Sequence, residues 1–210
     1  MPYTPKHKDG TRQRILESAR RVFNRKGFSE ATIDEIMADA GLSHGGFYRH
    51  FGSKGDLYAE AVRRFLCKEA PTPWRGKHGV GKTQARRVLD SYFSLDHFDD
   101  LERCCPLIGL PSEVSRSGAD VKAAYQEVVE KLLSIFEAEL DGPRARERAL
   151  AVVALCVGGM VLARGVDDLA LADELRSAAY RQALSAAGWG APANLTERVW
   201  APAEQIRQQG

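Results

Sequence analysis

The densest group of side chains able to bind another molecule lies between residues 43 and 54. Hydroxyl, imidazole, phenol and cationic groups follow one another there, around two adjacent glycines: Ser43, His44, Gly45, Gly46, Tyr48, Arg49, His50 and Lys54. Tyr and His can hydrogen-bond phosphate oxygens, and Lys or Arg adds positive charge. Each glycine costs roughly 1 kcal/mol in a helix, so the pair indicates a close backbone approach to a partner. These features are typical of a helix that enters the major groove of DNA.

Three short helices are predicted to position these groups. The first is expected over Thr11–Lys26, with Gly27 in a left-handed conformation after it and Phe28 packing back onto it. Thr32 and Glu35 form a capping box that begins the second helix, and Thr32 is also placed to reach phosphate. A turn at residues 40–42 joins this helix to a third, capped by Ser43 and running to about Phe51. The apolar residues between the polar ones predict a core of Ile33, Ile36, Leu42, Phe47 and Phe51.

Helical periodicity continues through the rest of the chain, and strand patterns are almost absent. Ser53 is expected to cap a helix from Lys54 to Ala70, and a loop rich in Pro and Gly follows at residues 71–82. The remaining expected helices cover residues 83–98, 120–140, 144–166 and 169–187, with an irregular segment at 104–111 and a hinge at 141–143. The predicted fold class is therefore all-α. The predicted domains are a helix-turn-helix domain at 1–54 with a flexible arm at 1–10, a helical effector-binding and dimerisation domain at 55–188, and a tail of uncertain order at 189–210.

Charge and cysteine usage limit the class of protein. Net charge is only +2, but residues 1–54 hold ten Lys and Arg against six Asp and Glu, which fits a DNA-binding segment on a nearly neutral body. The longest nearly apolar run, Ala149–Ala163, has 15 residues, fewer than the roughly 20 that a membrane span needs. The four cysteines lack the spacing of a disulfide scaffold or a zinc site. We expect a cytoplasmic protein without membrane association, metal or cofactor.

The run from Gly41 to Lys54 resembles the signature of the TetR family of bacterial transcriptional regulators. It contains the Gly-hydrophobic-Ser turn, a small residue, a hydrophobic-Tyr pair, His, Phe and a Ser-Lys pair before a Leu. The resemblance implies double-stranded DNA as a partner, with a near-palindromic operator bound by a homodimer, and repression relieved by an effector of unknown identity. It also implies that His44, Gly45 and Gly46 face bases, and that Arg49 faces either bases or phosphates. The groups implied to contact phosphates are Thr32, Ser43, Tyr48, His50 and Lys54.

The second half of the chain offers candidates for dimerisation and for effector binding. The apolar run at 149–163, with Gly158 and Gly159 allowing close packing, and the amphipathic helix at 169–187 are expected to form a two-fold interface. Apolar aromatic residues, including Phe93 and Tyr125, are candidates for lining an effector pocket, with core packing as the alternative. Cys105 precedes Pro106, which suits the first position of a helix, where a thiolate would be stabilised. The adjacent Cys104 is a further candidate.

Two alternatives to regulation by a diffusible ligand remain at this point. The segment from Cys105 to a Glu-Val pair at 113–114 resembles a TetR subgroup in which some members sense electrophiles or oxidants, so Cys105 is either a sensor or a buried structural thiol. The second alternative is an NTP-binding enzyme, because Gly76–Thr83 fits the G-x-x-x-x-G-K-[ST] spacing of a phosphate loop. Pro71 and Pro73 argue against the central strand that such a loop requires. We expect no enzymatic activity.

Overall fold

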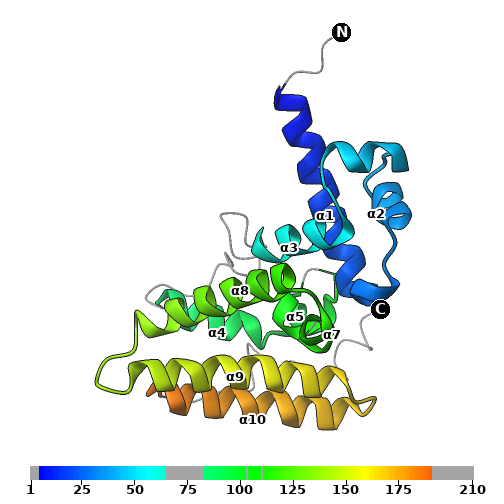
Figure 1. Ribbon diagram of the computed structural model, residues 1–210. Helices are drawn as coiled ribbons and strands as arrows, with labels where there is room; N and C mark the ends of the chain where they lie inside the picture. Colours follow the sequence, from blue (N-terminus) through cyan, green and yellow to red (C-terminus); the bar gives the residue numbers. More distant parts are fainter. Residues whose placement is uncertain (1–4, 65–82, 103, 110, 191–210) are drawn as a thin grey trace. The chain divides into compact units, whose positions relative to one another are not determined.

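The computed structural model describes residues 5–64, 83–102, 104–109 and 111–190. Within these ranges the ordered elements are helices and none is a strand, which confirms the all-α fold class (Figure 1). The chain forms two compact units. One comprises residues 1–70 and 101–128, and the other comprises 71–100 and 129–210. The functional division predicted after residue 54 is a different boundary and stays a prediction.

The first unit begins with α1 (Pro5–Glu30), which is longer than predicted at both ends. Residues 5–10, expected in a flexible arm, are helical, because a proline is tolerated at the first helical position and no strong breaker follows it. At the other end the helix kinks at Gly27, which has φ 82° and ψ 169°. The predicted positive φ at this glycine is confirmed, and Phe28 packs back on Phe23 with ring centroids 5.9 Å apart.

The next two helices carry the predicted DNA-contacting residues. α2 (Ile33–Asp39) begins with the predicted capping box between Thr32 and Glu35. The following helix, η1 (His44–Arg49), is a 3₁₀ helix that ends two residues before the α-helix we predicted, and Ser43 precedes it without a side-chain capping bond. Two glycines in its first turn weaken α-helical propensity, which accounts for the tighter and shorter element.

α3 (Lys54–Arg64) follows, and the hydroxyl of Ser53 caps it by accepting a hydrogen bond from the main-chain N–H of Asp56 at 3.0 Å. α1 is fastened to α2 by a hydrogen bond and to Phe51, which follows η1, by a cation–π contact. Ser18 donates to the carbonyl of Ile36 at 2.9 Å, and the Arg12 guanidinium lies 4.2 Å from the centre of the Phe51 ring. The predicted core is confirmed for the fully buried residues Ile36, Phe47 and Phe51. It is wrong for Ile33 and Leu42, which are only half-buried because they lie at the start of α2 and in the turn after it.

Two short helices occupy most of the segment predicted to be irregular. α6 (Pro106–Gly109) and α7 (Pro111–Arg116) each begin with a proline, which also separates them. The prediction that Pro106 opens a helix is confirmed. α8 (Ala119–Glu137) then runs from the first unit into the second, since the division falls between residues 128 and 129.

The second unit contains α4 (Gln84–Tyr92) and α5 (Leu95–Asp99), where one continuous helix to residue 98 was predicted. The interruption has a local cause. Ser94 adopts an extended conformation and its hydroxyl accepts a hydrogen bond from the main-chain N–H of His97, so it starts a new helix.

Burial lowers the pKa of His97 to about 4, and the nearby Arg164 contributes to the same shift.

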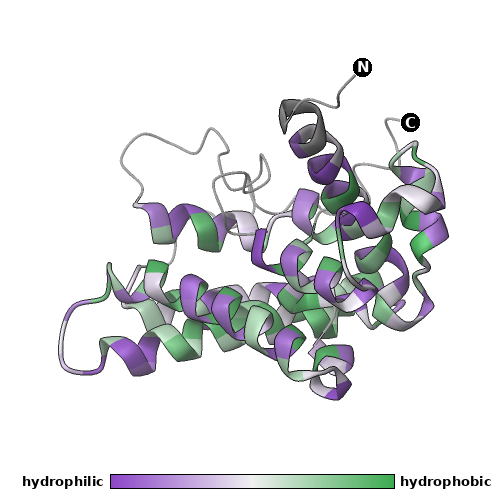
Figure 2. Cartoon of the chain, turned by 45° about the horizontal axis from the view of Figure 1, so that its top comes forward, coloured by the Kyte–Doolittle hydropathy of each residue, from purple (hydrophilic) through white to green (hydrophobic). Residues whose placement is uncertain are grey.

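α9 (Ala145–Arg164) and α10 (Leu169–Ala187) lie side by side in Figure 1 and close the second unit. A methyl group placed on Gly159 would lie 2.4 Å from the Cβ atom of Ala179, so this glycine permits the close packing that was predicted. Each helix combines apolar and polar residues (Figure 2). α9 is apolar beyond its buried face, and Leu150, Val161 and Leu162 remain exposed. No helix among the described residues is both long and apolar enough to span a membrane.

Several expectations concern residues outside the described ranges. These are the extension of α3 to Ala70, the loop at 71–82 with the phosphate-loop spacing that ends at Thr83, and residues 191–210 of the tail. Among the described residues, Gly188 has a left-handed conformation (φ 72°) after α10, and Thr83 caps α4.

Candidate nucleic-acid interface

η1 presents most of its side chains to solvent. Tyr48 is 62% exposed while the adjacent Phe47 is fully buried, so the helix anchors one aromatic ring inside and displays the other. This arrangement follows from the sequence, because the two rings occupy successive positions on a tight helix. The other predicted contact residues are also accessible. Thr32, Ser43, His44, Gly45 and Arg49 are exposed, and Gly46 and His50 are half-buried.

The two glycines of η1 are not required by the internal packing of the protein. Apart from its chain neighbours and the backbone of its own helix, no described atom lies within 4 Å of a Cβ atom built on Gly45, and Gly45 lacks the positive φ that would favour glycine. A Cβ atom on Gly46 would make an ordinary contact with Met37 at 3.5 Å. A side chain at either position would therefore fit the isolated protein, so internal packing does not explain the two glycines.

A hollow of about 590 Å³ adjoins η1. Its walls combine apolar side chains, from Met37 and Leu42, with polar ones, and they include four of the predicted DNA-contacting residues: Ser43, Gly46, Arg49 and His50. Thr11 of α1 completes the lining. The first helix and the predicted recognition helix thus bound one concave surface, which carries the positive charge of Arg49.

His44 opens η1 and contacts an acidic residue of α2. Its Nδ1 atom lies 2.5 Å from Oδ1 of Asp34, and its ring centroid is 6.1 Å from that of Tyr48. Both partners of the hydrogen bond are accessible, since the side chain of His44 is 49% exposed and that of Asp34 is 75% exposed. Asp34 was not among the predicted contact residues.

The side chain of Lys54 is used within the protein. Its ammonium group donates hydrogen bonds to the carbonyls of Phe28, Ser29 and Ala31, at 2.8, 3.3 and 3.0 Å. It also lies 4.6 Å from the centre of the Phe28 ring. The three donors of an ammonium group are thus satisfied by residues 28–31, the end of α1 beyond its kink at Gly27 and the residue after it. We call this segment the α1–α2 turn. What Lys54 presents at the start of α3 is its main chain, whereas its side chain fixes the preceding turn.

Glu113 of α7 binds the main-chain N–H groups of the same turn, whereas Lys54 binds its carbonyl groups. Its carboxylate accepts hydrogen bonds from the main-chain N–H groups of Phe28 at 2.6 Å and Ser29 at 3.3 Å. A Cβ atom on Gly27 would lie 2.8 Å from both carboxylate oxygens, so the glycine is needed for this approach as well as for its positive φ. Sequence reasoning missed this contact, because a separation of 85 residues leaves no local pattern.

The capping box at the start of α2 is electrostatically reinforced. The pKa of Glu35 is lowered to about 2, first by its hydrogen bond with Lys26 and then by the main-chain N–H of Thr32. The Thr32 hydroxyl accepts from the N–H of Glu35 at 3.2 Å. Thr32 is therefore held in place for its predicted phosphate contact.

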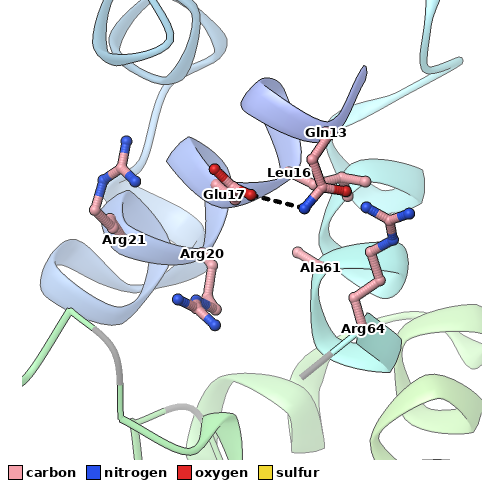
Figure 3. Close-up of a pocket in the computed structure, with 7 residues that line it drawn as sticks. All are labelled: Gln13, Leu16, Glu17, Arg20, Arg21, Ala61 and Arg64. Atoms are coloured by element: carbon pink, nitrogen blue, oxygen red, sulfur yellow. Dashed lines mark hydrogen bonds between the residues drawn. The ribbon is translucent and has the colours of Figure 1, made fainter. Parts of the chain in front are cut away.

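A second hollow, of about 190 Å³, lies between α1 and α3 (Figure 3). Gln13 donates to Glu17, one turn further along α1, at 2.7 Å, and three arginines contribute to the lining of the hollow: Arg20, Arg21 and Arg64. It shares no lining residue with the hollow beside η1, and none of the predicted contact residues borders it. We therefore treat it as separate from the candidate interface.

The effector candidates fall in both units. Cys104, Cys105 and Tyr125 belong to the first unit, and Phe93 belongs to the second, where it is fully buried. Burial raises the pKa of Tyr125 to about 12, with a further contribution from Cys105. Cys104 and Cys105 are each 1% exposed. The helix after Cys105 has only four residues, so it offers little of the electrostatic stabilisation that we expected for a thiolate.

No group of three or more His, Cys, Asp or Glu side chains suited to a metal ion occurs in the part of the chain that the structure describes.

The Asn24 side chain donates to the carbonyls of Glu102 and Cys104, at 3.1 and 3.0 Å. α1 is therefore tied to the cysteine segment by hydrogen bonds from the Asn24 side chain to main-chain carbonyls, and to Glu113 through its own main-chain N–H groups.

Comparison with known proteins matches the region that contains the predicted DNA-contacting residues. The model of the bacterial regulatory proteins of the tetR family matches residues 15–61. The HTH-type transcriptional regulator LmrA of Bacillus subtilis is 29% identical over 168 residues, which cover 72% of this chain and 85% of LmrA. The uncharacterized HTH-type regulator YfiR of the same organism is 37% identical over 63 residues, but the match spans only 31% of YfiR.

Among solved structures, the reduced form of NemR from E. coli has a TM-score of 0.67 and 19% sequence identity. The similarity covers 88% of this chain and all of the NemR chain. At this level of identity the comparison shows a shared fold. The relatives matched in sequence are described as transcriptional regulators.

Proposed function

Because this chain belongs to the TetR family of bacterial regulatory proteins and is a DNA-binding transcriptional regulator, we propose that it represses transcription as a homodimer released from its operator by a small molecule. The observation that carries the DNA-binding mode is the surface of η1. Exposed polar side chains surround Gly45, which has no neighbour of its own among the described residues. A duplex that approaches the backbone closely supplies the missing reason for the glycine.

Within this interface we assign two kinds of contact. His44, Gly45 and Gly46 face base edges in the major groove, with Arg49 at the border between bases and phosphates. Thr32, Ser43, Tyr48 and His50 bind phosphate oxygens, and the start of α3 at Lys54 does so through its main-chain N–H groups. Exposure of the hydroxyl-bearing side chains supports these roles. The hydrogen bonds of the Lys54 side chain favour an indirect role, in which it keeps the α1–α2 turn in the shape that binds DNA.

The dimer interface is proposed on the outer face of α9 and α10. Leu150, Leu162 and Leu171 are 47%, 59% and 42% exposed on these helices, although they are large and apolar. A second copy of the same face would bury them in an isologous four-helix arrangement. Two residues that the sequence suggested for the seam, Ala183 and Leu184, are already buried within one subunit and take no part in this proposal.

The switch is proposed to act through the contacts at the end of α1. The segment from Glu102 to Glu113 holds α1 through Asn24 and holds the α1–α2 turn through Phe28 and Ser29. An effector that favours another arrangement of this segment would reorient η1, shifting the population toward a form unable to bind adjacent half-sites. The same turn is bound by the side chain of Lys54, at the start of α3.

A thiol switch at Cys105 is the second candidate. It is supported by the bond from Asn24 to the carbonyl of the neighbouring Cys104, since a change at either thiol would disturb the end of α1. The related fold of NemR is described in a reduced form, which favours testing redox chemistry here. Against it stands the burial of both thiols. The proposal assigns no catalytic activity to the chain.

The experiment is binding of the full chain to a fluorescent duplex carrying the region upstream of its own gene, followed by anisotropy at two salt concentrations. We expect two subunits per site and an affinity that falls as salt rises. Addition of a thiol-reactive electrophile to wild type and to Cys105→Ser separates the two switches. Release of wild type alone supports the thiol route, while release of neither directs the search to pocket ligands. Equal affinity for random DNA would contradict specific binding to this region.

A further inference from the structure

The contact between Asp34 and His44 has a consequence for base recognition that depends on the proposed function. The two residues belong to different helices, with Asp34 in the first turn of α2 and His44 at the first position of η1. Their hydrogen bond spans ten residues of sequence and crosses the turn at Gly41. Since both side chains are accessible, burial does not force them together.

The chemistry of the pair fixes the position of one proton. A carboxylate has only acceptors, so the Nδ1 atom of His44 must carry the hydrogen that Asp34 accepts. In a neutral imidazole the other nitrogen, Nε2, is then an acceptor. The ring is also restrained, because one edge is bound to Asp34 and its other neighbour is the Tyr48 ring, 6.1 Å away.

We propose that Asp34 is a positioning residue, which selects the tautomer of the neutral His44 ring whose Nε2 atom accepts a hydrogen bond from DNA. In the major groove the matching donors are exocyclic amino groups, on N4 of cytosine or N6 of adenine. His44 would then discriminate against base edges that offer only acceptors, such as that of guanine at O6 and N7. The adjacent Gly45 has no side chain that could occupy the space next to His44.

The position of Asp34 allows a simpler interpretation. An acidic residue in the first turn of a helix is stabilised by the helix dipole whether or not it contacts His44. In that case the carboxylate would only repel phosphates, and its removal would raise affinity for every duplex alike. The two interpretations differ in base preference, which a purely structural role does not change.

The test uses the full chain and a random pool of duplexes, from which the preferred sequence of wild type is selected. Affinities for this duplex and for its single base-pair variants are then measured for Asp34→Ala, His44→Ala and the double variant. We expect each single variant to lose at least about fivefold discrimination at the same base pair. The double variant should lose no more than either one, because the residues act as a unit.

Glu17→Gln is the matched charge control. It removes one negative charge from the first unit, at the hollow between α1 and α3 rather than beside η1, and should leave the base preference unchanged. The inference is overturned if Asp34→Ala behaves like this control, or if it alters a different base pair from His44→Ala. A wild-type protein that selects no sequence overturns the proposed function itself, and this inference with it.

Discussion

Gly45 and Gly159 differ in how much space surrounds the Cβ position of each glycine. On α9, a methyl group at Gly159 would lie 2.4 Å from Ala179, so the neighbouring helix leaves no space for a side chain. On η1, a methyl group at Gly45 meets none of the described atoms within 4 Å. The first glycine is explained by the packing of the subunit. The second is not explained by the packing of the subunit, and under the proposed function its place is beside the bases of the bound duplex.

The largest expected effect is on the α9–α10 contact. Gly159→Val should lower the free energy of unfolding by about 3 kcal/mol, because the inserted methyl groups force two closely packed helices apart. Urea unfolding followed by circular dichroism measures this change. Gly158→Ala is the matched control, since nothing described lies within 4 Å of a Cβ atom there. An equal loss in both variants would show that close packing at residue 159 is not the cause.

The second effect concerns pH and the α4–α5 junction. The pKa of His97 is lowered from 6.5 to about 4 by burial and by Arg164, so the unfolded chain binds a proton more readily than the folded one. Stability should therefore fall by at least about 2 kcal/mol as pH decreases from 6.5 to 4. His97→Gln should lose less stability over that window. The same slope in both proteins would exclude His97 as the group responsible.

The third prediction addresses the turn that supports η1. Glu113→Gln should reduce the protection of the Phe28 and Ser29 amides from hydrogen exchange by about 1 kcal/mol, because a charged acceptor becomes neutral. Glu102→Gln is the control. It weakens an exposed ion pair with Arg25, at 2.9 Å, and should change protection by about 0.5 kcal/mol or less. Unchanged exchange in Glu113→Gln would remove this carboxylate from the proposed route of regulation.

The smallest effect is expected at the start of α2. The pKa of Glu35 is lowered from 4.5 to about 2, chiefly by Lys26 and then by Thr32. Its contribution to stability is present above pH 4.5 and is lost as pH falls toward 2. Wild type should be more stable than Glu35→Gln at pH 6, and the two should converge near pH 2. A constant difference across this range would show that charge on Glu35 is unimportant.

Local patterns predicted much of the fold. The capping box at Thr32, the helix start at Pro106 and the bounds of α10 depend on residues within a few positions of one another, so the sequence contains the cause. The break at Ser94 was missed because the apolar periodicity continues across this serine and predicted one helix over residues 83–98. The 3₁₀ form of η1 was missed although Gly45 and Gly46 indicated weak helical propensity.

Within the site, the exposed residue types could be predicted and their partners could not. The contact of Lys54 with three carbonyls joins residues 23–26 positions apart. That of Glu113 with Phe28 joins residues 85 positions apart. Such contacts form only when the helices pack, so the periodicity of the sequence does not predict them. The bond between Asp34 and His44 is closer in sequence but depends on the direction of the intervening turn.

The measurement that tests the central claim most directly is paired binding and unfolding of Gly45→Val. Anisotropy with the preferred duplex gives affinity, and urea unfolding gives stability. The vacant surroundings of Gly45 predict a change in unfolding free energy of no more than about 0.5 kcal/mol. Contact with DNA predicts an affinity at least about tenfold weaker. Wild-type affinity in a folded Gly45→Val protein would contradict the assignment of η1 as the surface that meets the bases.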